Sequence, residues 1–451
     1  MSNFLFNEFK GTTPEAWKQK IQAELKGADY NQTLLWKTNE GIVVKPFYTK
    51  EDRNNLAVNL PKENFFTCQT IFIGDEKKAN SIAINAINRG ANAIQFTANK
   101  TFNYQLLLKN LDILKSTIYF SFSFLNEEFI VEISKYLNSK NCFFQTDIIG
   151  NLAKTGNWHV NLKEDFKKLE TIVASSENCI AVSGDMYQNA GANMVQQLAY
   201  MLAHANEYIN RFNDIIVSKI HFKFAVGSNY FLEIAKLRAF RVLWSSLLEN
   251  YQIPNVPAHI FTQPTLRNKT LYDYNVNMLR TTSEYMSAIL GGSNTVSTIS
   301  YDAIYHKSNE FGERIARNQL LILQEESGFI EAQNFVNGAY YIESLTEQLA
   351  EKALVIFKEI EKNGGLLQQL RDGTIQKKIK ESALKEDSQL KENTICLLGT
   401  NLQPNKKDTM KHNLELYPFV KQRNIKTIIT PIIQKRISED IEQDRLKQEN
   451  A

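Results

Sequence analysis

The chain has 451 residues, of which 43% are hydrophobic and 22% charged, a composition typical of a folded globular protein rather than a disordered or collagen-like one. The formal net charge of +3 is too small to indicate binding to nucleic acid or to an anionic membrane surface. No run approaches the roughly 18 apolar residues of a membrane span, and the first residues lack the basic and apolar regions of a secretory signal. We therefore expect a cytoplasmic protein without a membrane segment.

The four cysteines lie far apart, and no two of them have metal-ligand or redox spacing. Isolated thiols of this kind are typical of reduced residues in a protein core. We expect this state for Cys68, Cys142, Cys179 and Cys396.

Residues 1–65 differ in character from the rest and are interpreted as an N-terminal arm. Trp17, Ile21 and Leu25 recur every four residues, which predicts a short amphipathic helix over 14–26 that ends near Gly27. Prolines farther along the arm argue against long regular elements there.

From residue 66 to 365, short β-rich runs alternate with helical segments. Several runs are apolar on both faces, which is typical of parallel strands covered on both sides. Eight such strands predict a (β/α)8 TIM-type barrel, with a doubly wound open sheet as the alternative. No Gly-rich nucleotide fingerprint supports that alternative. The predicted strands are 69–73, 92–97, 117–123, 142–147, 178–183, 218–225, 258–263 and 294–299.

The chain after the eighth strand is predicted to be mostly helical. The segment 344–365 has a Ser344 to Glu347 capping box and stops at a pair of glycines. Beyond it, residues 366–451 are rich in Lys, Glu and Gln and are interpreted as a C-terminal helical extension with a solvated surface.

In a barrel enzyme the chemistry lies at the C-terminal ends of the strands, and here those positions are poor in titratable groups. Asp75, Asp147 and Asp185 follow predicted strands, and we interpret them as helix N-caps, the commoner use of aspartate at that place. No pair of histidines has HxxxH or HExxH spacing. We expect His204 and His221 to be packed or surface residues rather than ligands.

Four long blocks of sequence occur, in order, in one known family. They resemble the barrel of methylmalonyl-CoA mutase, and residues 36–49 are similar to the segment that precedes that barrel. The likeness covers most of residues 1–365 and is firmest over 183–353. The blocks are SGDMYQNAGANMVQQLAYMLAHANEYI, FLEIAKLRAFRVLW, YNVNMLRTTSEYMSAILGGSNTVSTISYDA and ERIARNQLLILQEESGFIEAQNFVNGAYYIESLTEQLAEKA.

The resemblance implies a cobalamin-dependent radical rearrangement of an acyl-CoA. In the family, the coenzyme A thioester threads the barrel, and adenosylcobalamin caps it from a C-terminal domain that supplies a histidine through Asp-x-His-x-x-Gly. None of the histidines here has that surrounding pattern. We therefore expect no flavodoxin-like cobalamin domain, no metal site and no bound cofactor in this chain, with adenosylcobalamin in a partner subunit. The histidines are His159, His204, His221, His259, His306 and His412.

The predicted barrel mouth departs from the catalytic members of the family. Those members carry Tyr-His after the Ser-Gly of the fifth strand, whereas Ser183–Gly184 is followed here by Asp185 and Met186. The family imidazole hydrogen-bonds the thioester carbonyl, and a methionine thioether cannot donate that bond. Gln145 matches a substrate-contacting glutamine, but inherited packing would also retain it.

Two further family features have no counterpart. The Arg-Gln-Tyr-Ala-Gly-Phe block is missing before the first strand, and the substrate-clamping arginine is missing over 158–170. Lysine does not replace arginine at a bidentate site. The lysines in that segment are Lys163, Lys167 and Lys168.

These departures resemble the small (beta, non-catalytic) subunit of the family. We expect a subunit without its own activity that forms a heterodimer with a larger catalytic mutase subunit, with Gln145, Asp185 and Met186 as vestigial mouth positions. One alternative is an acyl-CoA-binding barrel of a split mutase that borrows cobalamin from a separate protein, and a free-standing coenzyme A-binding protein has no positive support. We expect the arm to wrap the partner, although it could also fold back on its own barrel. Its apolar side chains are Phe4, Phe6, Phe9, Trp17, Leu34, Leu35 and Trp36.

Overall fold

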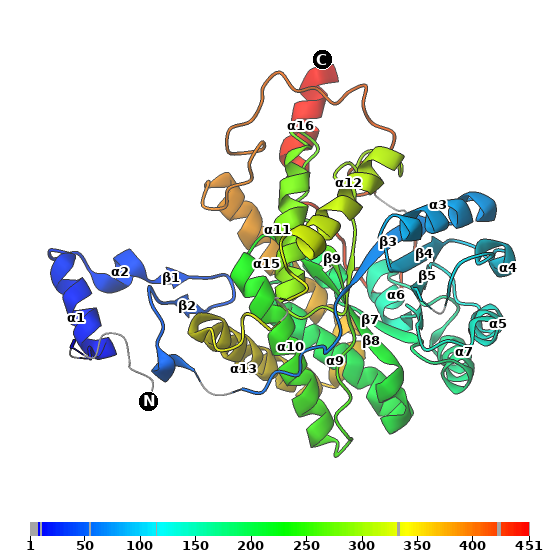
Figure 1. The fold of residues 1–451 in the computed structure, drawn as a ribbon, viewed down its shortest axis with the longest axis horizontal. Coiled ribbons are helices and arrows are strands. Elements are labelled where there is room, and N and C mark those ends of the chain that lie inside the picture. The colour runs from blue at the N-terminus through cyan, green and yellow to red at the C-terminus, as the bar shows by residue number, and fades with distance from the viewer. Residues whose placement is uncertain are drawn as a thin grey trace.

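Eight parallel strands form a barrel at the centre of the molecule, which the computed structural model describes over residues 8–9, 11–53, 56–113, 115–331, 334–421 and 425–450 (Figure 1). The strand order is β6-β5-β4-β3-β10-β9-β8-β7. The end strands β6 and β7 are joined by a parallel bridge between Thr146 and Ile180. The predicted barrel is confirmed, and the open-sheet alternative is wrong. The strands are β3 (Phe66–Phe72), β4 (Ala93–Ala98), β5 (Thr117–Phe122), β6 (Cys142–Phe144), β7 (Ile180–Ser183), β8 (Ile220–Val226), β9 (Ile260–Pro264) and β10 (Thr295–Ser297).

Helices surround the barrel because alternate strand residues present apolar side chains outward. Phe222 of β8 packs edge-on against Phe240 and Trp244 of α10, with ring centroids 4.5 and 4.9 Å apart. No helix in the described ranges is long and apolar enough to cross a membrane. The helices are α3 (Glu76–Asn88), α4 (Tyr104–Leu107), α5 (Glu127–Leu137), α6 (Ile148–Thr155), α7 (Leu162–Ser175), α8 (Asp185–Asn189), α9 (Met194–Phe212), η2 (Asn213–Lys219), α10 (Tyr230–Asn250), α11 (Val276–Leu290), α12 (Glu310–Leu321), η3 (Ile322–Glu326) and α13 (Tyr340–Lys362).

Inward-facing aromatic side chains fill the N-terminal half of the barrel lumen. The Tyr119 ring lies 4.8 Å from both Phe143 and Phe261, measured between centroids. Phe143 also stacks on His259 at 4.3 Å, and His221 packs edge-on against the same ring. Burial lowers the pKa of His259 to about 3 and holds that of His221 well below its usual range, so both imidazoles are neutral. We call Tyr119, Phe143, His221, His259 and Phe261 the aromatic plug.

The N-terminal arm projects from the barrel, at the left of Figure 1. Its first helix begins after Thr13, whose hydroxyl accepts from the Ala16 N–H, and none of its residues is buried. The arm is attached at its later part, where Tyr48 packs against Tyr341 of α13 and Arg53 pairs with Glu343 at 3.3 Å. The elements of the arm are α1 (Pro14–Glu24), α2 (Tyr30–Leu34), β1 (Trp36–Lys37), β2 (Val43–Val44) and η1 (Lys50–Asp52).

The C-terminal extension is helical only at its two ends. It contains α14 (Gly365–Arg371), α15 (Thr374–Lys391) and α16 (Glu439–Asn450), while the described part of 392–438 forms neither helix nor strand, so the expectation of a helical extension is wrong there. The Ser344 capping box is also wrong, because α13 begins at Tyr340 and Ser344 lies inside it. In both segments, tertiary contacts rather than local helix signals determine where the chain is helical.

Residues 425–438, which we call the strap, hydrogen-bond to residues that follow the barrel strands. Their amides donate to the carbonyls of Gly156, Ala153, Asn189 and Arg267, which follow β6, β7 and β9. Gly156 is required at the first of these contacts, because its φ is +81° and an added Cβ would lie 2.7 Å from the Ile429 carbonyl oxygen. The strap therefore lies along the rim of the barrel mouth.

Candidate functional site

A cavity of about 390 Å³ opens at the C-terminal ends of β5 to β8. The three mouth residues singled out from the sequence, Gln145, Asp185 and Met186, all line it. Gln434 of the strap also contributes to its wall. Because these residues come from separate strand ends and from the strap, the barrel brings together what is distant in sequence. The remaining lining residues used below are Phe122, Phe124, Asp147, His159, Ser183 and Lys223.

Asp185 forms an ion pair inside the mouth instead of capping a helix. Its Oδ2 atom lies 3.2 Å from the Lys223 Nζ atom and accepts from Gln263 Nε2 at 3.1 Å. The N-cap expectation for Asp185 is therefore wrong, since Gly184 occupies that position and makes no side-chain cap. Lys223 is not among the mouth residues that the sequence singles out. Its alternation with Phe222 and Phe224 along β8 was the available signal, because it places the lysine on the inner face.

Gln145 ends a row of hydrogen bonds that crosses the barrel interior. The Ser297 and Thr70 hydroxyls lie 3.0 Å apart, Thr70 donates to Gln95 Oε1 at 2.7 Å, and Gln95 Nε2 donates to Gln145 Oε1 at 2.6 Å. The Gln145 Nε2 atom is buried and has no hydrogen-bond partner among the described residues. An unused donor therefore remains at the mouth end of this row.

Asp147 caps α6, as expected, and also holds three elements together. Its carboxylate accepts from Gly150 N–H at 2.7 Å, Ser183 N–H at 2.9 Å and Tyr208 O–H at 2.8 Å, and it pairs with His204 Nε2 at 2.9 Å. Burial alone would raise the pKa of Asp147, but the His204 charge and these hydrogen bonds outweigh it and lower the pKa. Because its oxygens are saturated, Asp147 acts as a fixed structural anion. Asp75 is likewise confirmed as an N-cap, of α3.

A methionine, Met186, stands where the resemblance expects an imidazole, and no arginine lines the described cavity. Met186 is buried, with 3% of its surface exposed, and offers no donor to a carbonyl. Lys168 pairs instead with Glu127 of α5 at 2.9 Å, and neither it nor Lys163 nor Lys167 lines the cavity. Nothing in the described lining replaces the bidentate clamp.

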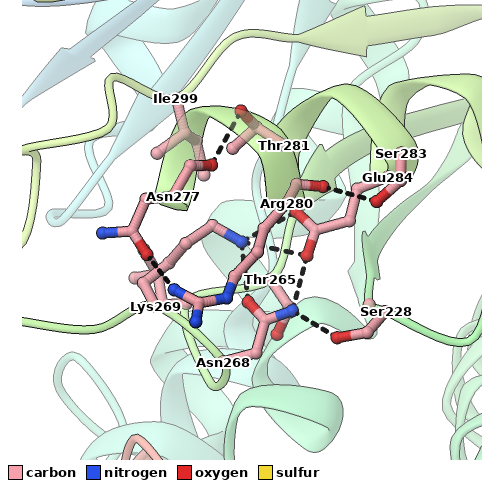
Figure 2. Close-up of polar contacts among 12 residues, drawn as sticks. Ser228, Thr265, Asn268, Lys269, Asn277, Arg280, Thr281, Ser283, Glu284 and Ile299 are labelled. Carbon is pink, nitrogen blue, oxygen red and sulfur yellow. Dashed lines mark hydrogen bonds and ion pairs between the residues drawn. The ribbon is translucent and has the colours of Figure 1, made fainter. Parts of the chain in front are cut away.

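A second polar cluster lies beside the mouth, between the loop after β9 and α11. Figure 2 shows the Lys269 ammonium between Asn268 and Glu284, with distances of 2.7 and 2.9 Å to the two Glu284 oxygens. Asn268 donates to the same carboxylate at 2.6 Å and to Ser228 at 2.7 Å. Burial raises the pKa of Glu284 and lowers that of Lys269, while their mutual attraction opposes both shifts. The cluster is fully satisfied and fixes the loop after β9.

Comparison with known proteins agrees with the resemblance. The family model for methylmalonyl-CoA mutase matches residues 129–447. The chain belongs to the methylmalonyl-CoA mutase family. It is 31% identical to the methylmalonyl-CoA mutase small subunit of Porphyromonas gingivalis, over 99% of this chain and 78% of that protein.

Two other family members match a shorter region. The methylmalonyl-CoA mutases of Cereibacter sphaeroides and Escherichia coli are 37% and 34% identical over half of this chain, and the matched part spans 33% of the length of each. A DAHP synthase from Thermotoga maritima has a TM-score of 0.36 at 12% identity and covers 70% of this chain and 94% of its own. The strand order itself identifies the barrel.

The family cofactor, adenosylcobalamin, does not fit the residues at this mouth. His159 is the histidine that lines the described cavity, and it has Asn157 and Leu162 where the cobalt-binding motif requires Asp and Gly. The described ranges also contain no group of three His, Cys, Asp or Glu side chains able to hold a metal ion.

Proposed function

We propose that this chain is the structural, non-catalytic small subunit of an adenosylcobalamin-dependent methylmalonyl-CoA mutase. In this proposal a larger catalytic subunit binds the cofactor and interconverts methylmalonyl-CoA and succinyl-CoA in the cytoplasm. The end-to-end similarity to a small subunit supports this assignment. The observation that carries it is the aromatic plug.

The plug occupies the path that the coenzyme A chain follows in the family. The Tyr119 ring centroid lies 4.8 Å from those of Phe143 and Phe261, which is aromatic packing distance and opposes the passage of a pantetheine chain. The Tyr119 hydroxyl is tied to Thr295 at 2.7 Å and to His259 at 2.8 Å. Opening the lumen would break these hydrogen bonds and expose buried rings. Substrate binding would have to overcome that free-energy cost.

The arm supplies the surface that the proposal needs for a partner. Trp17 and Trp36 expose 49% and 50% of their surfaces, and Trp17 stacks on Phe47 with centroids 4.2 Å apart. Tryptophan side chains of this kind dominate binding energy in protein interfaces. A groove of about 760 Å³ lies between the arm and α13 and could accept a partner segment. An obligate interface on the order of 2,000 Å² or more is expected.

The split-mutase alternative requires this barrel to bind acyl-CoA itself. Gln145 and the Lys223–Asp185 pair leave some polarity in the mouth, which is what that alternative has in its favour. The plug opposes it, since the thioester would have no path down the barrel, and Met186 offers no hydrogen-bond donor at the position where the family has an imidazole. We therefore favour the structural subunit.

Reconstitution tests the proposal directly. The full chain and the large mutase subunit are expressed separately and mixed, and size-exclusion chromatography with light scattering should give a one-to-one complex. The isolated chain should show no saturable corrinoid absorbance and no turnover of methylmalonyl-CoA. Met186→His should stay inactive, because the clamp and the cofactor site are also missing and such residues act as a unit. One-to-one corrinoid binding by the isolated chain would overturn the proposal.

A further inference from the structure

The mouth cavity has unused hydrogen-bond donors on one side. Because the Thr70 hydroxyl donates to Gln95, and Gln95 donates to Gln145, each group in the row uses its acceptor on the side away from the mouth. At the mouth end of the row, the Nε2 atom of Gln145 is buried and donates to no partner in the described structure. A buried unpaired donor is costly, so an acceptor at this place would be stabilised.

The second donor is the Lys223 ammonium, which also lines the cavity. An ammonium carries three N–H donors, and its ion pair with Asp185 uses one of them. Asp185 already accepts from Gln263, and Asp147 is saturated by four donors. Spare donors therefore remain on Gln145 and Lys223, and the hydroxyl of Ser183 also lines the cavity.

The walls limit the size and charge of what the donors could hold. Phe122, Phe124 and Met186 provide apolar surface, and the aromatic plug closes the lumen below. A cavity of about 390 Å³ takes a small molecule but not a coenzyme A ester whose tail must pass down the barrel. Since Asp185 neutralises much of the Lys223 charge, a singly charged group fits better than phosphate.

We propose that the barrel mouth binds a small free monocarboxylate, with its carboxylate on Gln145 Nε2 and Lys223 Nζ and a short apolar tail against Phe122, Phe124 and Met186. The site would make the barrel of a non-catalytic subunit responsive to short-chain acids. This inference goes beyond the proposed function and does not depend on it, because it concerns the isolated full chain.

Methyl NMR of the full chain labelled at methionine measures this binding at the site itself. Met186 lines the cavity, and its resonance is assigned with Met186→Leu. Titration with acetate, propionate and butyrate should shift that methyl signal saturably, with a dissociation constant on the order of 1 mM for butyrate. Butyramide, the neutral isostere, and inorganic phosphate should bind at least about tenfold more weakly, since each cation–carboxylate contact contributes about a factor of ten.

Two variants locate the carboxylate. Gln145→Leu removes the terminal donor, and the paired change Lys223→Met with Asp185→Asn removes the cation without leaving an unpaired anion. Each should weaken butyrate binding at least about tenfold. Lys135→Met, on the exposed face of α5, is the matched control and should leave it unchanged. Thermal melting of each variant shows that the fold is retained.

Four results would overturn the inference. These are the absence of a saturable Met186 shift with any of the three acids, equal binding of butyramide, tighter binding of phosphate than of butyrate, or unchanged butyrate affinity in both folded variants. A failed reconstitution with the large subunit would leave this result untouched, so the two proposals fail separately.

Discussion

Aromatic side chains are buried in the barrel interior but exposed on the N-terminal arm. The barrel closes even its own lumen, where Tyr119 and Phe261 are fully buried and Tyr119 is hydrogen-bonded to Thr295. The arm presents α1 with no buried residue and keeps Trp17 about half exposed. Both regions are rich in aromatic side chains, so composition does not separate them. The difference lies in whether the chain itself supplies the contacts.

This contrast indicates which aromatic surface stabilises the fold and which remains to stabilise a complex. Buried aromatic area in the plug stabilises the fold and cannot also bind a substrate. Exposed aromatic area on the arm is stabilised only when a second surface covers it. Under the proposed function, the molecule would therefore associate at its periphery and carry out no chemistry at its centre.

The largest expected effect is the loss of stability when one partner of the buried Lys269–Glu284 ion pair is removed. Glu284→Leu leaves Lys269 buried without its carboxylate and should lower the free energy of unfolding by about 3–5 kcal/mol. The double change Glu284→Leu with Lys269→Met removes both charges and should restore stability to within about 1–2 kcal/mol of the wild type. Urea unfolding of the three proteins measures this. A double variant as unstable as the single one would show that the pair itself, and not the unpaired charge, matters.

The next effect concerns the arm. Deleting residues 1–28 removes α1 but keeps buried Tyr30, and it should raise the dissociation constant for the large subunit by about 100-fold, as loss of a tryptophan-centred contact does. The melting temperature should stay within about 2 °C, because α1 buries nothing against the barrel. Ile215→Ser, at an exposed apolar residue outside the arm, is the control and should leave affinity unchanged. Unaltered affinity after the deletion would mean that α1 is not a contact.

Much of the barrel could be predicted from sequence because strand patterns are local. All eight predicted strands overlap the observed ones, since alternation and apolar runs report burial directly. The arm helix over 14–26 was likewise close to α1, although Phe4 and Phe6 lie outside the described residues. Local signals were sufficient wherever an element depends on its own neighbours in the chain.

The candidate site was less predictable because its contacts are distant in sequence. The Asp185 pairing with Lys223 joins the residue after Gly184 to strand β8, and the strap residue Ile428 binds the carbonyl of Gly156, 272 residues earlier in the chain. The pattern of β8 places Lys223 inside the barrel but does not name its partner. Likewise, an aspartate after a strand predicts an N-cap, and at Asp185 the ion pair in the mouth overrides that preference.

A smaller effect tests the Asp147 anchor between the mouth and the helical layer. Asp147→Asn can still cap α6 but loses the charge that faces His204, and it should lower stability by about 1.5–3 kcal/mol at neutral pH. Because the folded pKa of Asp147 is lowered, its contribution is present above the unfolded pKa of about 3.9 and is lost as pH falls through the folded value. The difference between variant and wild type should therefore shrink as the pH falls below about 4.

Asp75→Asn is the matched control for that experiment. Asp75 caps α3 through the Lys78 N–H at 2.8 Å, and asparagine is an equally good cap, so the cost should stay below about 0.5 kcal/mol. Urea unfolding across the pH range measures both variants. Equal costs for the two substitutions would show that the His204 contact adds nothing to the cap.

The smallest effect on stability is expected at Glu313, a buried carboxyl group in the helical layer whose charge is poorly compensated. Burial raises the pKa of Glu313, in α12, to about 7, with repulsion from Asp302 in the same direction and opposition from the Ser308 hydrogen bond and Arg317. A raised folded pKa means that the native state gains stability from the protonated form. That contribution is fully present below the unfolded pKa of about 4.3 and is lost as pH rises through about 7.

Glu313→Gln should therefore be more stable than the wild type by about 1–2 kcal/mol at pH 8 and equal to it near pH 4. Urea midpoints at several pH values between these limits give the comparison, and Glu310→Gln, an exposed residue of the same helical turn, should show no such pH dependence. If Glu313→Gln and the wild type lose stability in parallel as pH rises, the buried carboxyl is not the source of the slope. The polar groups around Glu313 would then compensate its charge as completely as those around Glu284 compensate Lys269. The difference between the well-paired barrel and the exposed arm would then include α12.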